Sequence, residues 1–135
     1  MTQRNSARGD HNLWPGLTYD DALAARDWLS GLGFIEGVLV ADVDGTVHHS
    51  EMLWPEGGRV TVSSRGKSDD TFAVARGAAS VYVVVDDPDR VYARAHELGA
   101  VIVREMASTD YGSRGFSVKD AEGNRWSFGT YAGEE

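Results

Sequence analysis

The most suggestive chemical pair in the sequence is His49 and Glu51, which lie two positions apart in a β-rich stretch. Side chains two apart on a strand share one face of the sheet, so both can meet the same ligand. A histidine beside a carboxylate suits general acid–base chemistry or supplies half of a metal site. The competing interpretation is a polar lining or a surface pair. His48, one residue away, is expected to face the opposite way.

Other candidate residues are aromatic or cationic. Arg114, in the phrase Tyr-Gly-Ser-Arg, either binds an anionic ligand or braces a turn. Bracing the turn is the favoured interpretation. An aromatic pocket for a flat or apolar ligand can be assembled from four residues, for which core or dimer packing is the alternative: Trp14, Trp54, Tyr82 and Tyr111. The sequence has no cysteine, which excludes thiol nucleophiles and cysteine metal sites. No glycine-rich phosphate loop or Ser-His-Asp spacing is present.

Charge and hydropathy restrict the partners. The 135-residue chain has 13 Lys+Arg against 21 Asp+Glu, a formal charge of −8, which argues against nucleic acid as a partner. The balance weakly favours neutral or cationic ligands, although simple solubility explains it as well. No stretch approaches the roughly 20 apolar residues that span a bilayer. The polar start of the chain does not resemble a signal peptide, so a cytoplasmic location is expected.

The elements that must position these residues follow from capping and periodicity. Asp20 and Asp21 begin one helix that ends at Gly33, and Asp87 with Pro88 begins a second that ends at Gly99. Alternating or β-rich runs predict eight strands: residues 13–19, 34–41, 46–54, 59–64, 79–85, 101–107, 111–119 and 125–131.

This order of strand, helix and three strands occurs twice, which indicates an internal repeat. At an offset of 66 positions, the separation of Asp21 from Asp87, residues 14–64 align on 80–130 without a gap and nine of the 51 pairs are identical. The matches fall at helix caps, helix ends and turns, where backbone geometry selects the residue. We therefore predict an α+β fold of two βαβββ modules with pseudo-two-fold symmetry. The expected organisation is a flexible lead-in (1–12), one domain (13–131) made of module 1 (13–64), a linker (65–78) and module 2 (79–131), and a tail (132–135).

Several phrases in the chain resemble the glyoxalase/bleomycin-resistance/dioxygenase group, also called the vicinal oxygen chelate superfamily. The most specific runs from Tyr111-Gly-Ser-Arg114 to Asp120-Ala-Glu-Gly-Asn124-Arg-Trp-Ser-Phe128. The resemblance implies two curved sheets with helices on their convex sides, a cavity on the concave sides, and a homodimer. It also implies up to four metal ligands, from the first and last strands of each module.

The positions that match those ligands are Trp14, Thr61, Ser80 and Ser127. None is an imidazole or a carboxylate, which first-row metals prefer. The resemblance therefore favours the fold and disfavours the metal chemistry, so no cofactor is expected. A divalent metal is expected only if His49 and Glu51 bind one.

Strand alternation gives the expected faces. Val60, Val62, Trp126 and Phe128 should face the helices, with Arg59 and Arg125 near the cavity mouth. The expected ligand-binding residues are Trp14, His49, Glu51, Thr61, Ser80, Tyr82, Tyr111, Arg114 and Ser127. Two functions remain open. One is metal-free binding of a small organic molecule. The other is a lyase, isomerase or dioxygenase-type enzyme that uses His49 and Glu51.

Overall fold

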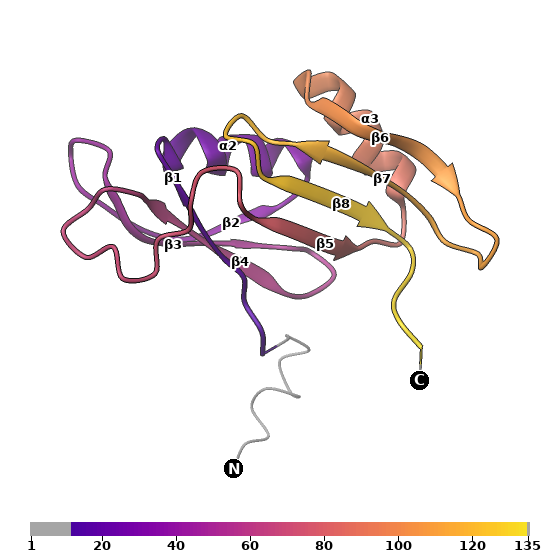
Figure 1. Ribbon diagram of the computed structural model, residues 1–135, viewed down its shortest axis with the longest axis horizontal. Coiled ribbons are helices and arrows are strands. Elements are labelled where there is room, and N and C mark those ends of the chain that lie inside the picture. The colour runs from indigo at the N-terminus through magenta and orange to yellow at the C-terminus, as the bar shows by residue number, and fades with distance from the viewer. Residues whose placement is uncertain (1–11, 135) are drawn as a thin grey trace, which may run out of the picture. The chain divides into compact units, whose positions relative to one another are not determined.

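The computed structural model describes residues 12–134, and the chain forms two compact units that divide between Ala75 and Arg76. Each unit has one four-stranded mixed sheet and one helix (Figure 1). The predicted α+β architecture of two βαβββ modules is confirmed. The predicted lead-in, residues 1–12, lies outside the described residues except for Asn12. In residues 12–134, no helix is long and apolar enough to cross a membrane.

Unit 1 follows the predicted element order closely. Its elements are β1 (Gly16–Tyr19), α2 (Ala22–Leu32), β2 (Ile35–Ala41), β3 (Val47–Leu53) and β4 (Arg59–Ser64). The sheet order is β1-β4-β3-β2, with β1 parallel to β4 and the other pairs antiparallel. The Asp21 carboxylate accepts from Ala24 N–H at 3.0 Å and caps α2. Gly33, at φ 122°, ends the helix.

Unit 2 repeats this arrangement. Its elements are β5 (Ser80–Val84), α3 (Pro88–Leu98), β6 (Val101–Ser108), β7 (Arg114–Lys119) and β8 (Arg125–Gly129). The sheet order is β5-β8-β7-β6, with β5 parallel to β8. Asp87 caps α3 through Arg90 N–H, Pro88 occupies the first turn, and Gly99 ends the helix in the left-handed conformation. The capping residues identified in the sequence therefore set both helices.

The repeat extends to strand register. In unit 1, Gly16 pairs with Thr61, and in unit 2 the residues 66 positions later, Tyr82 and Ser127, pair with each other. The antiparallel pair Glu51–Thr61 likewise has its counterpart in Ser117–Ser127. A one-residue slip would move every side chain to the other face of the sheet. The two units therefore present equivalent positions on equivalent faces.

Burial shows which face of each sheet packs on its helix. Along β4, Val60, Val62 and Ser64 are buried, whereas Arg59, Thr61 and Ser63 are half-exposed. α2 packs against all four strands of its sheet, and α3 packs against β6, β7 and β8. The expected facing of Val60, Val62, Trp126 and Phe128 is confirmed. Fully buried side chains of the core include Leu17, Tyr19, Leu29, Leu32 and Met52 in unit 1, and Phe116, Val118, Trp126 and Phe128 in unit 2.

Candidate functional site

A hollow of about 660 Å³ lies on the face of the unit 1 sheet that carries the half-exposed β4 residues. This volume is within the range of about 300–1,000 Å³ that is usual for small-molecule sites. Most of its lining groups are polar, with two aromatic side chains among them. The lining residues are Trp14, Gly16, Thr18, His48, His49, Thr61, Ser63, Lys67, Ser68, Asp69 and Phe72.

The second wall of this hollow is the segment of residues 65–75, which we expected to be only a linker. Arg65 fastens its start: the guanidinium donates to Thr18 O at 2.7 Å, to Val74 O at 3.0 Å and to Asp20 at 2.7 Å. Its end is fastened by a reciprocal pair, in which Val74 N–H donates to Thr18 Oγ1 and that hydroxyl donates to Val74 O. The segment is therefore tied to β1 at both ends.

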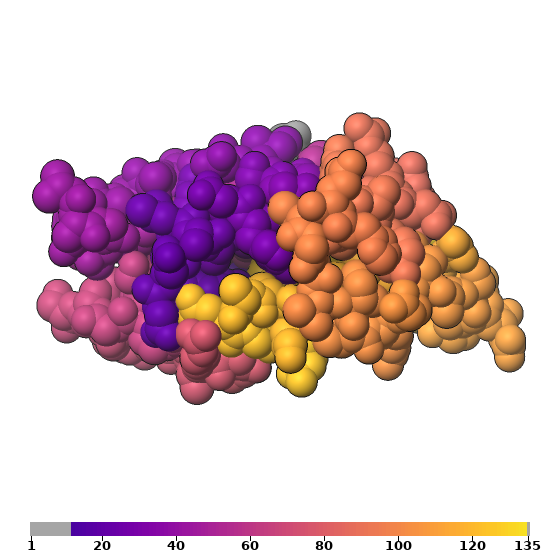
Figure 2. All heavy atoms as spheres, turned by 90° about the horizontal axis from the view of Figure 1, so that it is seen from above, coloured from indigo at the N-terminus to yellow at the C-terminus, as the bar shows by residue number. Residues whose placement is uncertain are grey.

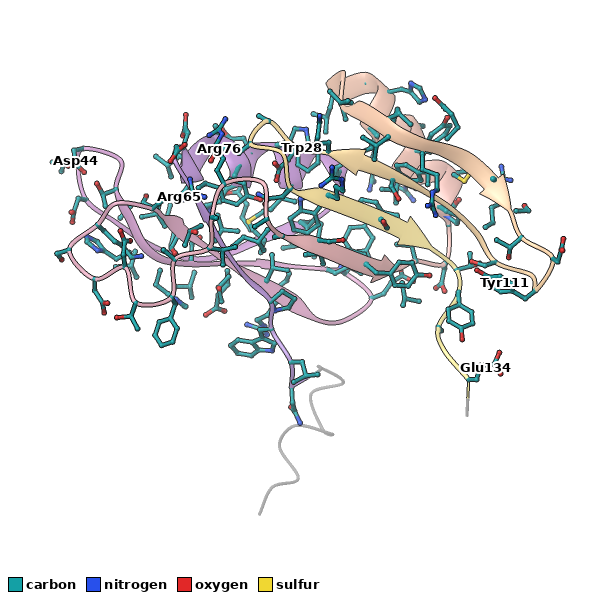
Figure 3. The ribbon with its side chains drawn as sticks, in the orientation of Figure 1. Trp28, Asp44, Arg65, Arg76, Tyr111 and Glu134 are labelled. Carbon is teal, nitrogen blue, oxygen red and sulfur yellow. The ribbon has the colours of Figure 1, made fainter. Side chains whose placement is uncertain are left out.

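The figures show this arrangement from two sides. Figure 3 places Arg65 where β4 leaves the sheet, at the root of the 65–75 segment. In Figure 2 the same segment, in pink, and the β2–β3 turn, in purple, form separate projections at one end of unit 1. The wall is therefore a loop that projects separately from the β2–β3 turn.

A β-bulge brings both histidines to the hollow. Val40 pairs with His49 but the next residue, Ala41, pairs with Val47, so that β3 carries one extra residue at this point. Val47 and Ser50 are both buried, and the two residues between them are both exposed. The prediction that His48 faces the opposite way is therefore wrong. The prediction assumed that side chains alternate regularly between the two faces along β3, and the bulge interrupts this alternation.

A chain of polar contacts connects His49 to Trp14. His49 Nε2 lies 2.8 Å from Glu51 Oε2, and Arg59 Nη1 donates to Glu51 Oε1 at 2.8 Å. The Arg59 guanidinium carbon is 4.8 Å from the centre of the Trp14 ring, a cation–π contact. The expectation that His49 and Glu51 share a face is confirmed. Arg59 joins that pair to the aromatic wall of the hollow.

Electrostatics assign different roles to the two members of the pair. The hydrogen bonds from His49 and from Arg59 hold the pKa of Glu51 below its usual range, against the opposing effect of burial. Glu51 is therefore a carboxylate at neutral pH and acts as an acceptor only. Because the carboxylate can only accept a hydrogen bond, His49 donates Nε2–H in this contact. In the neutral imidazole, Nδ1 then carries the lone pair.

Arg26 supports the pair from the other side of the sheet. Its buried guanidinium, on α2, donates to Glu51 O at 3.2 Å and to Val38 O and Gly37 O at 3.4 Å. These carbonyls lie at a second irregularity, where the pairing of β2 with β3 shifts. Arg26 therefore satisfies backbone groups that the bulged ladder leaves unpaired. It fixes the backbone of Glu51 while the side chain of Glu51 faces the opposite side.

Three of the predicted site residues of unit 2 are uncharged: Ser80, Tyr82 and Ser127. Ser117 and Ser127 share a hydrogen bond of 2.7 Å at the positions equivalent to Glu51 and Thr61. The Tyr82 hydroxyl donates to Tyr131 O at 2.7 Å, and burial raises the pKa of Tyr82. Ser80 lies exposed at the start of β5. The histidine–carboxylate pair of unit 1 therefore has no counterpart at the equivalent positions of unit 2.

Three aromatic or cationic candidates have clear structural partners. Arg114 makes a two-pronged ion pair with Asp89, which agrees with the favoured bracing role. Tyr111, at the tip of the β6–β7 hairpin in Figure 3, packs edge-on against Tyr131 with centroids 5.6 Å apart. Trp54 is buried against Phe34 at 4.9 Å and belongs to the core of unit 1. The proposed aromatic pocket is therefore wrong in including Trp54.

The donor set does not fit the metal that the family resemblance implies. The four matching positions offer an indole at Trp14 and hydroxyls at Thr61, Ser80 and Ser127, which are poor ligands for first-row metals. Within residues 12–134, no three or more His, Asp or Glu side chains are grouped so that they could hold an ion. His49 and Glu51 offer two donors, and Arg59 already holds the second carboxylate oxygen.

Sequence reasoning missed the lining contributed by the 65–75 segment. Lys67, Ser68, Asp69 and Phe72 lie in a polar, glycine-containing stretch without helical or strand periodicity. One signal was present: Phe72 is a single large aromatic residue in this otherwise polar stretch. A single exposed aromatic is a weak signal, because isolated apolar residues are common on protein surfaces.

The chain is similar to several known proteins. Residues 11–128 match the model of the Glyoxalase/Bleomycin resistance protein/Dioxygenase superfamily. TioX from Micromonospora sp. ML1 is 31% identical with a TM-score of 0.74, over 88% of this chain and 97% of that one. A glyoxalase/bleomycin resistance protein from Streptomyces sp. CB03234 is 18% identical (TM-score 0.69; 87% and 98% covered). The fosfomycin resistance protein FosX from Mesorhizobium loti is 15% identical (TM-score 0.64; 90% and 92% covered). No curated protein sequence matches the chain.

Proposed function

We propose that this chain, which belongs to the Glyoxalase/Bleomycin resistance protein/Dioxygenase superfamily, binds a small organic molecule in the hollow of unit 1 without using a metal ion. The observation that carries this proposal is the hollow itself: its volume is about 660 Å³, and it combines two aromatic side chains with hydroxyl and imidazole groups. An apolar body with a few fixed polar contacts is the usual composition of a ligand site.

Two features support binding over the family's metal chemistry. The ligand positions hold no imidazole or carboxylate, so an ion would have to depend on water for most of its shell. Trp14, which occupies one of those positions, instead lines the hollow and remains 42% exposed. Bleomycin and fosfomycin resistance proteins are named for resistance to a toxic compound, and binding of such a compound by this chain would be one use of the hollow.

A titration of the full chain with 2-naphthol, a flat two-ring probe, tests the site. Of the four tryptophan indole N–H signals in a ¹H–¹⁵N spectrum, that of Trp14 should shift most. Trp14→Leu should weaken binding by about 1–3 kcal/mol, since a buried aromatic contact is lost. Trp28→Leu, on α2 (Figure 3), is the matched control and should bind normally. Saturable binding that perturbs only unit 2, or no binding at all, overturns the proposal.

A second candidate function is acid–base catalysis by His49. The 2.8 Å contact with Glu51 favours it, because a carboxylate that orients an imidazole is a recurrent arrangement in proton transfer. A lyase or isomerase reaction would then place an acidic proton of the substrate near Nδ1. Turnover of a bound compound that is lost in His49→Leu and kept in His48→Leu would favour this candidate over binding alone.

We also propose that the protein is a homodimer in the cytoplasm. β2 and β6 each end their sheets, and edge strands with apolar side chains are normally covered by a partner. Exposed apolar residues are concentrated on these two strands: Ile35, Val38, Leu39 and Val40 on β2, and Val101 and Val103 on β6. Light scattering at micromolar concentration tests this proposal.

A further inference from the structure

The contacts of Trp14 indicate that the ligand has a flat ring. The indole lines the hollow, and the guanidinium of Arg59, which is not a lining residue, lies over the ring at 4.8 Å. Arg59 is in turn held by Glu51, so the indole rests against a fixed cation. A ring that is already oriented loses less conformational freedom when a second flat group stacks on it. Phe72 supplies a second aromatic side chain, from the 65–75 segment.

The contacts of His49 indicate which polar group such a ring should carry. Its Nε2–H is committed to the Glu51 carboxylate at 2.8 Å, and a neutral imidazole has one donor and one acceptor. The acceptor is therefore Nδ1. Within the described residues, no group donates a hydrogen bond to this atom. A ligand that meets His49 must supply an O–H or N–H donor.

The neighbouring His48 is less firmly held. Its Nε2 lies 2.8 Å from Asp42, a carboxylate whose side chain is 56% exposed. Glu51, by contrast, is only 13% exposed and is also bound by Arg59. The two imidazoles are similarly exposed, so the difference lies in the carboxylates, and water competes more strongly for Asp42 than for Glu51. His49 is therefore the better-fixed acceptor of the two.

The charges of the lining residues do not select a charged ligand. Lys67 and Asp69 face the hollow with opposite signs. Lys67 already donates to Ser64 O at 3.1 Å, and Asp69 already accepts from Thr71 through N–H and hydroxyl groups. The hydroxyls of Thr61, Ser63 and Ser68 can donate or accept and fix no preference. The lining of the hollow therefore does not share the excess negative charge of the whole chain, which is −8.

We infer that the hollow selects a neutral planar aromatic molecule that bears a hydrogen-bond donor, with its ring on Trp14 and its donor on Nδ1 of His49. This inference rests on the proposed binding function and adds the chemical class of the ligand. Phenols and N–H heteroaromatic compounds belong to that class. The corresponding ethers and N-alkyl compounds have the same shape but lack the donor, and they should bind less well.

A matched pair of probes tests the inference. 2-Naphthol carries the O–H donor, and 2-methoxynaphthalene replaces it with an ether. Isothermal titration of the full chain near pH 7 should show 2-naphthol binding about fivefold to tenfold more tightly, the usual effect of one neutral hydrogen bond. His49→Leu should reduce that ratio to about one, while His96→Leu, at an exposed position of α3 in unit 2, should preserve it.

A measurement on the unaltered protein covers the case in which His49→Leu does not fold. In ¹⁵N spectra of the imidazoles, Nδ1 of His49 should shift with 2-naphthol and stay unchanged with 2-methoxynaphthalene. If neither probe binds, the proposed function fails. If both bind with equal affinity, the site stands and the inferred ligand class is wrong. If the preference survives His49→Leu, or Nδ1 of His49 does not respond, His49 is not the acceptor.

Discussion

The guanidinium of Arg59 lies 4.8 Å from the centre of the Trp14 ring and, through Nη1, 2.8 Å from the carboxylate of Glu51. One side chain therefore holds both the aromatic wall of the hollow and the partner of His49, although it does not itself line the hollow. Arg59 acts as a positioning residue. Its substitution should affect ligand binding without removing any ligand contact.

We expect Arg59→Met to weaken 2-naphthol binding by about 1 kcal/mol, because the cation–π contact that orients Trp14 is lost. Titration calorimetry measures the change in affinity, and relaxation of the Trp14 indole N–H signal in a ¹H–¹⁵N spectrum should show greater ring mobility. Arg125→Met is the matched control, since Arg125 occupies the equivalent register position in unit 2. Equal effects of the two substitutions would argue against a positioning role for Arg59.

Acid should remove the stabilisation that Glu51 contributes. Its pKa in the folded protein is lowered by the hydrogen bonds from His49 and Arg59, relative to about 4.3 in an unfolded chain. The contribution is therefore complete above that unfolded value and is lost as the pH falls through the folded pKa. Urea unfolding at pH 7, 5 and 3.5 should show a smaller acid loss in Glu51→Gln than in the unaltered protein. Glu97→Gln, on α3, should behave like the unaltered protein.

Removing the buried guanidinium of Arg26 should destabilise unit 1. Arg26→Met leaves the carbonyls of Gly37, Val38 and Glu51 without their donor, at a cost of about 2–4 kcal/mol in the free energy of unfolding. Urea denaturation measures this loss. Arg90→Met, at an exposed position of α3, should change stability by less than about 0.5 kcal/mol. A similarly small loss for Arg26→Met would mean that water replaces the guanidinium.

We expect the purified protein to retain no stoichiometric divalent metal after dialysis against a chelator. The reason is the donor set at the family's ligand positions, one indole and three hydroxyls, which forms no stable transition-metal site. Elemental analysis provides the measurement. About one bound ion per chain after dialysis would contradict the prediction and would direct attention to His49 and Glu51.

The proposed dimer can be tested by substituting an exposed residue of the edge strand β2. Val38, on β2, is 54% exposed, and a lysine there should disfavour an apolar interface. Light scattering should show a dimer for the unaltered chain and a monomer for Val38→Lys. Val43→Lys, in the β2–β3 turn, adds the same charge at a fully exposed position and should leave the dimer intact. A monomeric unaltered chain would exclude the proposal.

The parts of the fold that the sequence predicts correctly depend on local chemistry. Asp21 and Asp87 each satisfy a helix N-terminus, and Gly33 and Gly99 each end a helix, so the helix bounds could be derived from single residues. Alternation placed Thr61 and Ser127 opposite the buried face because β4 and β8 are regular. Short-range rules succeed wherever the backbone is regular.

The parts that could not be predicted depend on irregular backbone and long-range contacts. The bulge that turns His48 toward the hollow arises from a register shift between β2 and β3, which neither strand reveals by itself. The wall formed by residues 65–75 depends on Arg65 reaching Thr18, 47 positions away. No local periodicity encodes such a contact. Pattern analysis therefore missed His48 and the four lining residues that this segment contributes.

The segment of residues 65–75 connects the two repeats and also lines the hollow, while taking no part in either sheet. Its central residues, 67–72, lie between the fastenings at Arg65 and Val74. Substitutions there change what the hollow presents without disturbing a ladder or a core. Under the proposed binding function, substitutions in this short stretch would change which ligand is bound at little cost to folding.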